Sequence, residues 1–288
     1  MLQFTSLLKL DEVSNLRCVK SAAAETLGTA ILVLMGCGPA GTLAPESSTM
    51  AVAFCFGLGL ALSIWVFGQV SGAHVNPAVT LGFFVTGHIG ILKSSVYILS
   101  QTFGAVLGAG IIRLTVPEPL RGVIGSTTLT EGVEQWQGFI IEMVTTFLLV
   151  MTVFASCDRL RTDHSGSTAL SIGFCATVCI AWSGVLTGGS MNPARSFGPA
   201  VWTGIWENHW IYWTAPITGG MMAALLYQKV FDEKVPEVNQ DLHFSQHKLN
   251  TSDVKREGFL DHTIVVDGPG ALPFQDSPQG GRFNFKHG

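Results

Sequence analysis

The triplet Asn-Pro-Ala occurs twice in the chain, at 76–78 and at 192–194. Asparagine is favoured at the cap before a helix, and proline at the first helical position. Each triplet therefore predicts the start of a short helix, capped by Asn76 or by Asn192. The residues expected in the first turns are Pro77, Ala78, Pro193 and Ala194. Since capping uses only the side-chain oxygen, the amide hydrogens of both asparagines are expected to stay free as donors.

The N-terminal end of a helix carries a partial positive charge. If the two short helices meet by these ends, their positive fields converge on one point. A small molecule such as water would accept hydrogen bonds there from Asn76 and Asn192, so its own hydrogens would face away. The same field would oppose protons and metal cations. The two triplets thus predict a place where small neutral molecules are oriented in single file.

Three ionisable side chains lie in apolar surroundings, namely Glu25, Glu142 and Arg195. A charge at membrane depth is costly and usually functional. A proton relay is one reading of the two glutamates, but their matching places in the chain favour buried structural braces. Gln101 is predicted to have a similar structural role.

Six segments are long and apolar enough to cross a hydrocarbon layer of roughly 30 Å as helices. Their approximate limits are 20–43, 49–69, 92–113, 136–156, 168–187 and 209–231. The two segments that follow Asn76 and Asn192 offer about ten helical residues each, which is too short to span. The sequence therefore predicts an all-α integral membrane protein with six spans and two half-helices.

An internal repeat relates the two halves of the chain at an offset of 116 to 117 residues. Glu25 and Thr29 recur as Glu142 and Thr146, and Gly57 and Gly104 recur as Gly173 and Gly220. Three spans in each half is an odd number, so the halves must insert with opposite orientation. The predicted fold is an inverted 3+3 repeat, in which discontinuous helices place a site at the midplane.

Charged residues make up 12% of the chain, about half of the usual share, and they concentrate after residue 231. We divide the chain into an N-terminal segment (1–19), a membrane domain (20–231, with halves about 20–113 and 136–231) and a disordered tail (232–288). Lys and Arg residues cluster on the side of both termini, which predicts a multi-pass protein of the cell membrane with cytoplasmic termini. The sequence has no basic stripe for nucleic acid.

Two longer runs around the triplets carry a family resemblance. They are Ser-Gly-Ala-His-Val-Asn-Pro-Ala-Val-Thr at 71–80 and Ser-Met-Asn-Pro-Ala-Arg-Ser-Phe-Gly-Pro-Ala at 190–200. Both resemble the pore loops of aquaporins, or major intrinsic proteins, and Trp-Glu-Asn-His-Trp-Ile-Tyr-Trp at 206–213 is similar to the orthodox animal water channels. The resemblance covers about 10–231. It implies a water channel, a homotetramer with one pore per subunit, and glutamate braces that accept backbone hydrogen bonds from the pore loops.

The resemblance also implies a selectivity filter made of Phe56, Ile180, Gly189 and Arg195, with Arg195 repelling cations at the extracellular constriction. Water-selective relatives usually have histidine where this chain has Ile180. An apolar Ile180 and a small Gly189 favour a wider filter that also admits glycerol, urea, ammonia or hydrogen peroxide. In the alternative, Phe56 still limits the width and water alone passes.

Other positions favour the water branch of the family. Glycerol facilitators typically have aspartate after the pore arginine, a basic residue four positions later and a proline-leucine pair on the sixth span. This chain has Ser196, Ala200, Tyr212 and Trp213 at those positions. The sequence therefore leaves two functions open: a water channel that tolerates some neutral solutes, or a channel whose main cargo is one of those solutes.

Other classes of protein fit the sequence less well. An ion-coupled transporter would need a titratable cluster at the midplane, where asparagines are expected. An enzyme would need a nucleophile with its base, or a metal cluster, and the spans have neither pattern. We expect no enzymatic activity, no cofactor and no bound metal, and the expected partners are water, small neutral solutes and the lipid bilayer.

Overall fold

The computed structural model describes residues 9, 12–13, 15–42, 49–158 and 166–232. Across these ranges the regular structure is helical, without a strand. The predicted tail lies outside the described residues, apart from Asp232. So do Arg159 and Arg161, two of the basic residues on which the predicted topology rests. The all-α architecture predicted from the sequence is confirmed.

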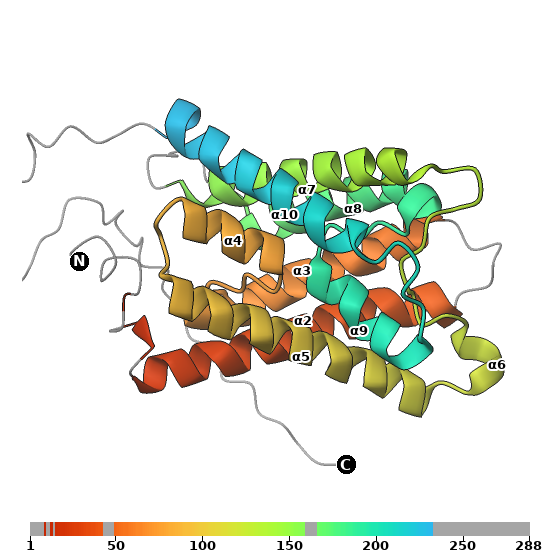
Figure 1. The fold of residues 1–288 in the computed structure, drawn as a ribbon. Helices are drawn as coiled ribbons and strands as arrows, with labels where there is room; N and C mark the ends of the chain where they lie inside the picture. The colour runs from red at the N-terminus through yellow and green to blue at the C-terminus, as the bar shows by residue number, and fades with distance from the viewer. Residues whose placement is uncertain (1–8, 10–11, 14, 43–48, 159–165, 233–288) are drawn as a thin grey trace, which may run out of the picture. The chain divides into compact units, whose positions relative to one another are not determined.

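Among the described residues, six long helices form the body, and the short helix α6 lies at its edge (Figure 1). The first half has α2 (Leu16–Thr42), α3 (Thr49–Ser71) and α5 (Ile91–Thr115), followed by the short α6 (Glu118–Arg121). The second half has α7 (Gln135–Cys157), α8 (Thr168–Thr187) and α10 (Ile211–Leu226). These limits differ from the predicted ones by a few residues.

Five helices of the described part, α2, α3, α5, α7 and α8, are long and apolar enough to cross a membrane. The α-helical part of α10 has only 16 residues, and it continues directly into the π-helix η2 (Tyr227–Phe231). The sixth predicted span is therefore helical almost throughout, but its last turn has wider hydrogen-bond spacing. The π-helical turn thus changes the pitch at the end of this span.

The two short helices are α4 (Pro77–Val85) and α9 (Pro193–Thr203), with 9 and 11 residues. They lie among the long helices, α4 toward the end of the molecule where α2 begins and α9 toward the end that carries α6 (Figure 1). Each begins with a proline after an extended asparagine. The local start signals in the sequence thus produce the two half-helices where they were predicted.

The packing of the helices repeats between the halves. In the first half α2 packs on α3 and α5, and in the second α7 packs on α8 and α10. Each half-helix packs on the last span of the opposite half, α4 on α10 and α9 on α5. This exchange is what an inverted repeat requires, because each pore helix is held by both halves.

Helices α3 and α8 cross at two glycines that correspond in the repeat. A Cβ atom on Gly57 would collide with the carbonyl oxygen of Gly173, and a Cβ atom on Gly173 would collide with that of Gly57. The two backbones therefore approach each other closely, and the side chain of Thr177 also lies against Gly57. Small residues permit such close crossings in membrane proteins.

The beginning and the end of the described chain lie at the same end of the molecule. Lys9 Nζ donates to the carbonyl oxygen of Gly87 at 2.9 Å, and Gln228 Nε2 donates to that of Thr86 at 2.9 Å. Both acceptors belong to the turn that ends α4. Residues near the two ends of the described chain are thus joined to one loop.

Candidate functional site

Asn76 and Asn192 cap the two half-helices through their side-chain oxygens. Asn76 Oδ1 accepts from the amide of Ala78 at 2.8 Å. Asn192 Oδ1 accepts from the amides of Ala194 and Arg195 at 3.0 and 3.2 Å. The capping geometry is the one that the two triplets predict, and it fixes where each amide nitrogen points.

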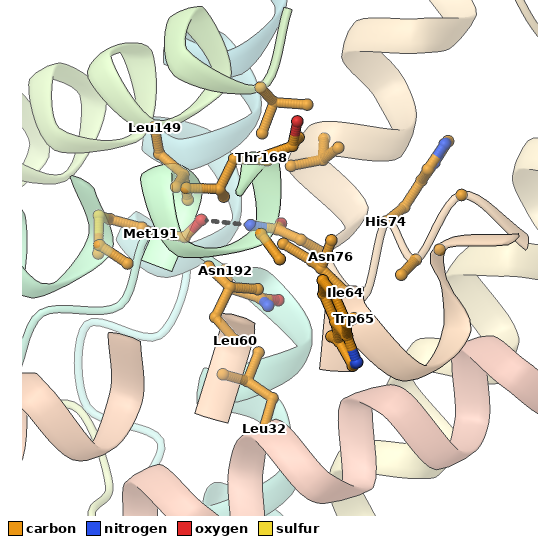
Figure 2. A pocket seen from close by; sticks show the side chains of 18 of the residues that line it. Leu32, Leu60, Ile64, Trp65, His74, Asn76, Leu149, Thr168, Met191 and Asn192 are labelled. Atoms are coloured by element: carbon orange, nitrogen blue, oxygen red, sulfur yellow. Dashed lines mark hydrogen bonds between the residues drawn. The ribbon is translucent and has the colours of Figure 1, made fainter. Parts of the chain in front are cut away.

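The amide nitrogens of the two asparagines join the half-helices to each other. Asn76 Nδ2 donates to the carbonyl oxygen of Met191 at 2.8 Å, the bond drawn in Figure 2, and Asn192 Nδ2 donates to that of Val75 at 2.8 Å. The sequence led us to expect all amide hydrogens to be free. Instead, one hydrogen of each amide holds the opposite loop, which leaves one further donor on each.

The residue before each asparagine adopts a left-handed backbone conformation. Val75 has φ 45° and Met191 has φ 52°. This conformation is costly for residues with a side chain, above all for a β-branched one, and it persists only where the surroundings enforce it. It turns each amide toward a buried glutamate: Val75 N donates to Glu25 Oε2 and Met191 N to Glu142 Oε2, both at 2.7 Å.

The second carboxylate oxygen of each glutamate also faces a pore loop. Glu25 Oε1 accepts from Ser71 Oγ at 2.6 Å and from the amide of His74 at 2.9 Å. Glu142 Oε1 accepts from Thr187 Oγ1 at 2.6 Å and from the amide of Ser190 at 2.9 Å. Both glutamates are completely buried. A carboxylate with this many donors is stable in the interior without a counter-charge in contact.

Gln101 connects the first glutamate to the half-helix. Its Nε2 atom donates to Glu25 Oε2 at 2.7 Å and to Thr80 Oγ1 at 2.9 Å. Thr80 is also 3.2 Å from His74 Nδ1. Among the described residues, the Oε1 atom of Gln101 has no hydrogen-bond partner.

A cavity of about 800 Å³ runs beside these loops. Asn76 and Asn192 lie next to each other on its wall, as Figure 2 shows, and His74 lies on the wall toward one side. Of the predicted filter residues, Phe56, Ile180 and Arg195 line the cavity. Most of the remaining wall is apolar: Leu32, Leu60, Ile64, Phe83, Leu149, Val153, Ile172 and Ala176.

Arg195 is held by two backbone carbonyls from separate segments. Its Nη1 atom donates to Gly125 O at 2.6 Å and its Nη2 atom to Gly188 O at 3.3 Å. Its Cζ atom lies 4.5 Å from the centre of the Phe56 ring. The guanidinium and the ring are thus in contact, a favourable cation–π arrangement. The Nε atom of Arg195 has no partner among the described residues and is a spare donor.

The other two predicted filter residues lie next to each other. Ile180 is buried apart from the face that lines the cavity. Gly189 does not line the cavity, and a Cβ atom on it would be 3.3 Å from Ile180 Cγ1 and 3.2 Å from Ser183 Oγ. A side chain at position 189 would therefore be in tight contact with Ile180 from its Cβ atom onward.

Two histidines lie outside the long helices as the structure has them: His74 precedes α4, and His209 precedes α10. Burial, together with the charge of Lys93, lowers the pKa of His74 to about 3. Burial also lowers the pKa of His209 below its usual value. The side chain of His74 is therefore neutral at physiological pH.

Several residues of the site were not singled out from the sequence as site residues. Tyr97 OH donates to the carbonyl oxygen of Ser71 at 2.8 Å, and Tyr212 OH donates to that of Thr187 at 2.9 Å. The two tyrosines recur at an offset of 115 residues, so the repeat carried a signal for them. Gly125 and Gly188 act through backbone carbonyls, which leave no such signal.

This arrangement has a definite chemical capacity. The N-terminal ends of α4 and α9 converge where Asn76 and Asn192 each retain one amide donor. Arg195 adds a fixed positive charge beside an aromatic ring. A neutral molecule with an acceptor oxygen is stabilised at both points, and a cation is repelled at both. Among the described residues no group of three or more metal-ligating side chains occurs.

Comparisons with known proteins agree with this geometry. The family model described as major intrinsic protein matches residues 12–227. The chain is 46% identical to aquaporin-4 of Mus musculus over 217 residues, which cover 74% of this chain and 67% of the relative. It is 39% identical to aquaporin-2 of Rattus norvegicus over 264 residues, which cover 91% of this chain and 97% of the relative.

A solved structure has the same fold. The X-ray structure of the aquaglyceroporin from Plasmodium falciparum matches with a TM-score of 0.67 at 22% identity. The match covers 74% of this chain and 96% of that one. At this identity the likeness concerns the fold alone.

Proposed function

The chain belongs to the major intrinsic protein family, and we propose that it forms a passive transmembrane channel whose main cargo is water. The observation that carries the proposal is the meeting of α4 and α9 at their N-terminal ends, joined by Asn76 and Asn192 on the wall of a cavity. The likeness to aquaporin-4 and aquaporin-2 supports water over glycerol as the cargo.

The proposed mechanism at the centre of the pore is orientation by fixed donors. A water molecule that accepts from the free amide hydrogens of Asn76 and Asn192 must point its own hydrogens away from the centre, in both directions. The file of water is therefore broken in orientation, so a proton does not hop along it. The two helix ends add a positive field, which opposes metal cations as well.

The second selective element is the constriction beside Arg195. Its guanidinium is fixed on Gly125 O and Gly188 O, so the charge stays where molecules pass. The contact with Phe56 supports a narrow passage, with Ile180 as an apolar wall. In this proposal Glu25, Glu142 and Gln101 brace the loops that carry the asparagines, and Gly189 leaves Ile180 uncovered.

A second cargo class follows from the same wall. Ile180 offers no hydrogen bond to a solute, and it lines the cavity as an apolar surface. This favours passage of small neutral solutes such as urea or glycerol beside water. We propose such tolerance as a secondary property of the channel.

The proposed setting is a cell membrane crossed six times, with both termini on the cytoplasmic side and four subunits in the assembly. Membership of the family supports the tetramer. The bonds that join Lys9 and Gln228 to one loop support a common side for the termini.

The test is osmotic. The full chain is reconstituted into lipid vesicles, and shrinkage is followed by stopped-flow light scattering under a sucrose gradient, and then under urea and glycerol gradients. We expect faster shrinkage than in empty vesicles, in proportion to the amount of protein. Shrinkage no faster than that of empty lipid would refute the water channel, and water flux without any solute uptake would refute only the secondary cargo.

A further inference from the structure

The position of Arg195 depends on the distance between two segments that are far apart in the chain. Gly125 lies in the connection between α6 and α7, and Gly188 is the C-cap of α8. Each offers one carbonyl oxygen to the guanidinium. If one segment moved relative to the other, the guanidinium would lose one of its two acceptors and leave the ring of Phe56.

A chain of buried hydroxyls joins these two segments. Thr127, two residues after Gly125, donates through Oγ1 to Ser196 Oγ at 2.9 Å. Ser196 Oγ is 2.6 Å from Ser190 Oγ, and Ser190 follows Gly188 by two residues. The three side chains are almost completely buried, so no solvent competes for these bonds.

The hydrogens of this chain can be assigned from its ends. Ser190 Oγ donates to the carbonyl oxygen of Asn192 at 3.1 Å, so its only hydrogen is used there. Ser196 must therefore donate to Ser190, and it accepts from Thr127. Each hydroxyl donates once, and the chain runs without a gap from Thr127 to the backbone of the pore asparagine.

We infer that Thr127, Ser196 and Ser190 are positioning residues that set the selectivity of the constriction, because they hold the two carbonyls of Arg195 at a fixed separation. The inference rests on the proposed function, since it concerns the filter of that channel. The chain of hydroxyls is anchored at its Ser190 end, because the amide of Ser190 donates to Glu142 Oε1 at 2.9 Å.

Breaking the chain of hydroxyls should loosen the filter without detaching the connection between α6 and α7 from α8. The connection before α7 keeps two other attachments to α8: Thr130 N donates to Leu186 O at 3.0 Å, and Thr130 Oγ1 donates to Val185 O at 2.7 Å. The fold therefore remains, while the guanidinium gains freedom to leave Phe56. Solutes larger than water should profit more from this freedom than water does.

The experiment compares urea and water permeability in reconstituted vesicles of the full chain. Thr127→Val removes the first hydroxyl of the series at nearly constant volume, and Ser196→Ala removes the middle hydroxyl. We expect the urea-to-water permeability ratio to rise about fivefold in each, the factor that the net loss of one intramolecular hydrogen bond produces in an equilibrium. Thr127→Ser keeps a hydroxyl at this position, so its urea-to-water permeability ratio should equal that of the unchanged protein.

The matched control is Ser126→Ala. Ser126 Oγ pairs with Thr203 Oγ1 at 3.0 Å, one residue away from Thr127 but outside the chain. Its removal should leave the ratio unchanged. The inference is overturned if Thr127→Val and Ser196→Ala keep the original permeability ratio, or if Ser126→Ala raises that ratio equally. It is also overturned if Thr127→Val and Ser196→Ala both lose all flux, since the three hydroxyls would then serve the fold and not the filter. Absence of water flux in the unchanged protein would instead overturn the proposed function, and this inference with it.

Discussion

At the scale of single residues, the site depends on side chains that bond to backbone atoms of the opposite half. Each asparagine holds the loop of the other through one amide hydrogen. Each glutamate accepts a hydrogen bond from the left-handed residue that precedes one of the asparagines. The pore donors are consequently fixed before any molecule arrives, which lowers the cost of orienting it.

A prediction at this scale concerns Ile180, the apolar wall of the constriction. The change Ile180→His adds a polar ring beside Arg195 and Phe56, which should narrow the passage and favour molecules that form hydrogen bonds in a small space. We expect the urea-to-water permeability ratio to fall by about tenfold, the lower range for a pocket altered by a single group. Water flux should persist.

Stopped-flow light scattering on matched vesicles measures both permeabilities. Ile180→Val serves as the control, because it keeps an apolar wall and should not lower the ratio. An unchanged ratio in Ile180→His would mean that Ile180 does not limit solute passage.

At the scale of elements, two short helices work as a pair because long helices of both halves enclose them. Each half-helix packs on the last span of the opposite half. The crossing of α3 and α8 at Gly57 and Gly173 joins the halves directly, backbone against backbone. Close packing of this kind is sensitive to a single added carbon atom.

The prediction at this scale compares two glycines of the same helix. In Gly57→Ala the new Cβ atom collides with two atoms of α8, Thr177 Oγ1 and the carbonyl oxygen of Gly173, so the protein should lose about 1–3 kcal/mol of stability. In Gly68→Ala the nearest atom, Ile64 Cγ2, is 4.0 Å away, so the better helix former should add about 0.5–1 kcal/mol. Thermal or denaturant unfolding in detergent, followed by circular dichroism, measures both changes.

The opposite signs make the pair its own control. Equal effects of the two substitutions would indicate that the crossing of α3 and α8 does not limit the packing of the halves.

At the scale of the whole molecule, the inverted repeat places both ends of the described chain beside one loop. Lys9 and Gln228 each donate to a carbonyl at the end of α4. The six proposed spans would return the chain to the side where it started, which agrees with a common side for both termini.

The corresponding prediction is topological. Epitope tags placed at the two termini should both be inaccessible to antibody in intact cells, and both should become accessible after the membrane is permeabilised. A tag inserted after Gly132, in the connection before α7, should show the reverse behaviour. One terminal tag accessible in intact cells would contradict an even number of spans.

The sequence by itself determined the features that depend on local chemistry. The apolar segments, the helix starts at Asn76 and Asn192 and the repeat predicted the fold, because caps, proline and apolar length act on the residues that carry them. Family resemblance added the candidate filter, and the roles of Phe56, Ile180, Gly189 and Arg195 stay predictions that await the flux measurements.

Only the tertiary structure decided which backbone atoms these side chains reach. The carbonyls of Val75, Met191, Gly125 and Gly188 accept the decisive hydrogen bonds. Every residue has the same carbonyl group, so the sequence does not distinguish the ones that will be used. Their choice depends on how the two halves pack, and this packing fixed both the single free donor on each asparagine and the position of Arg195.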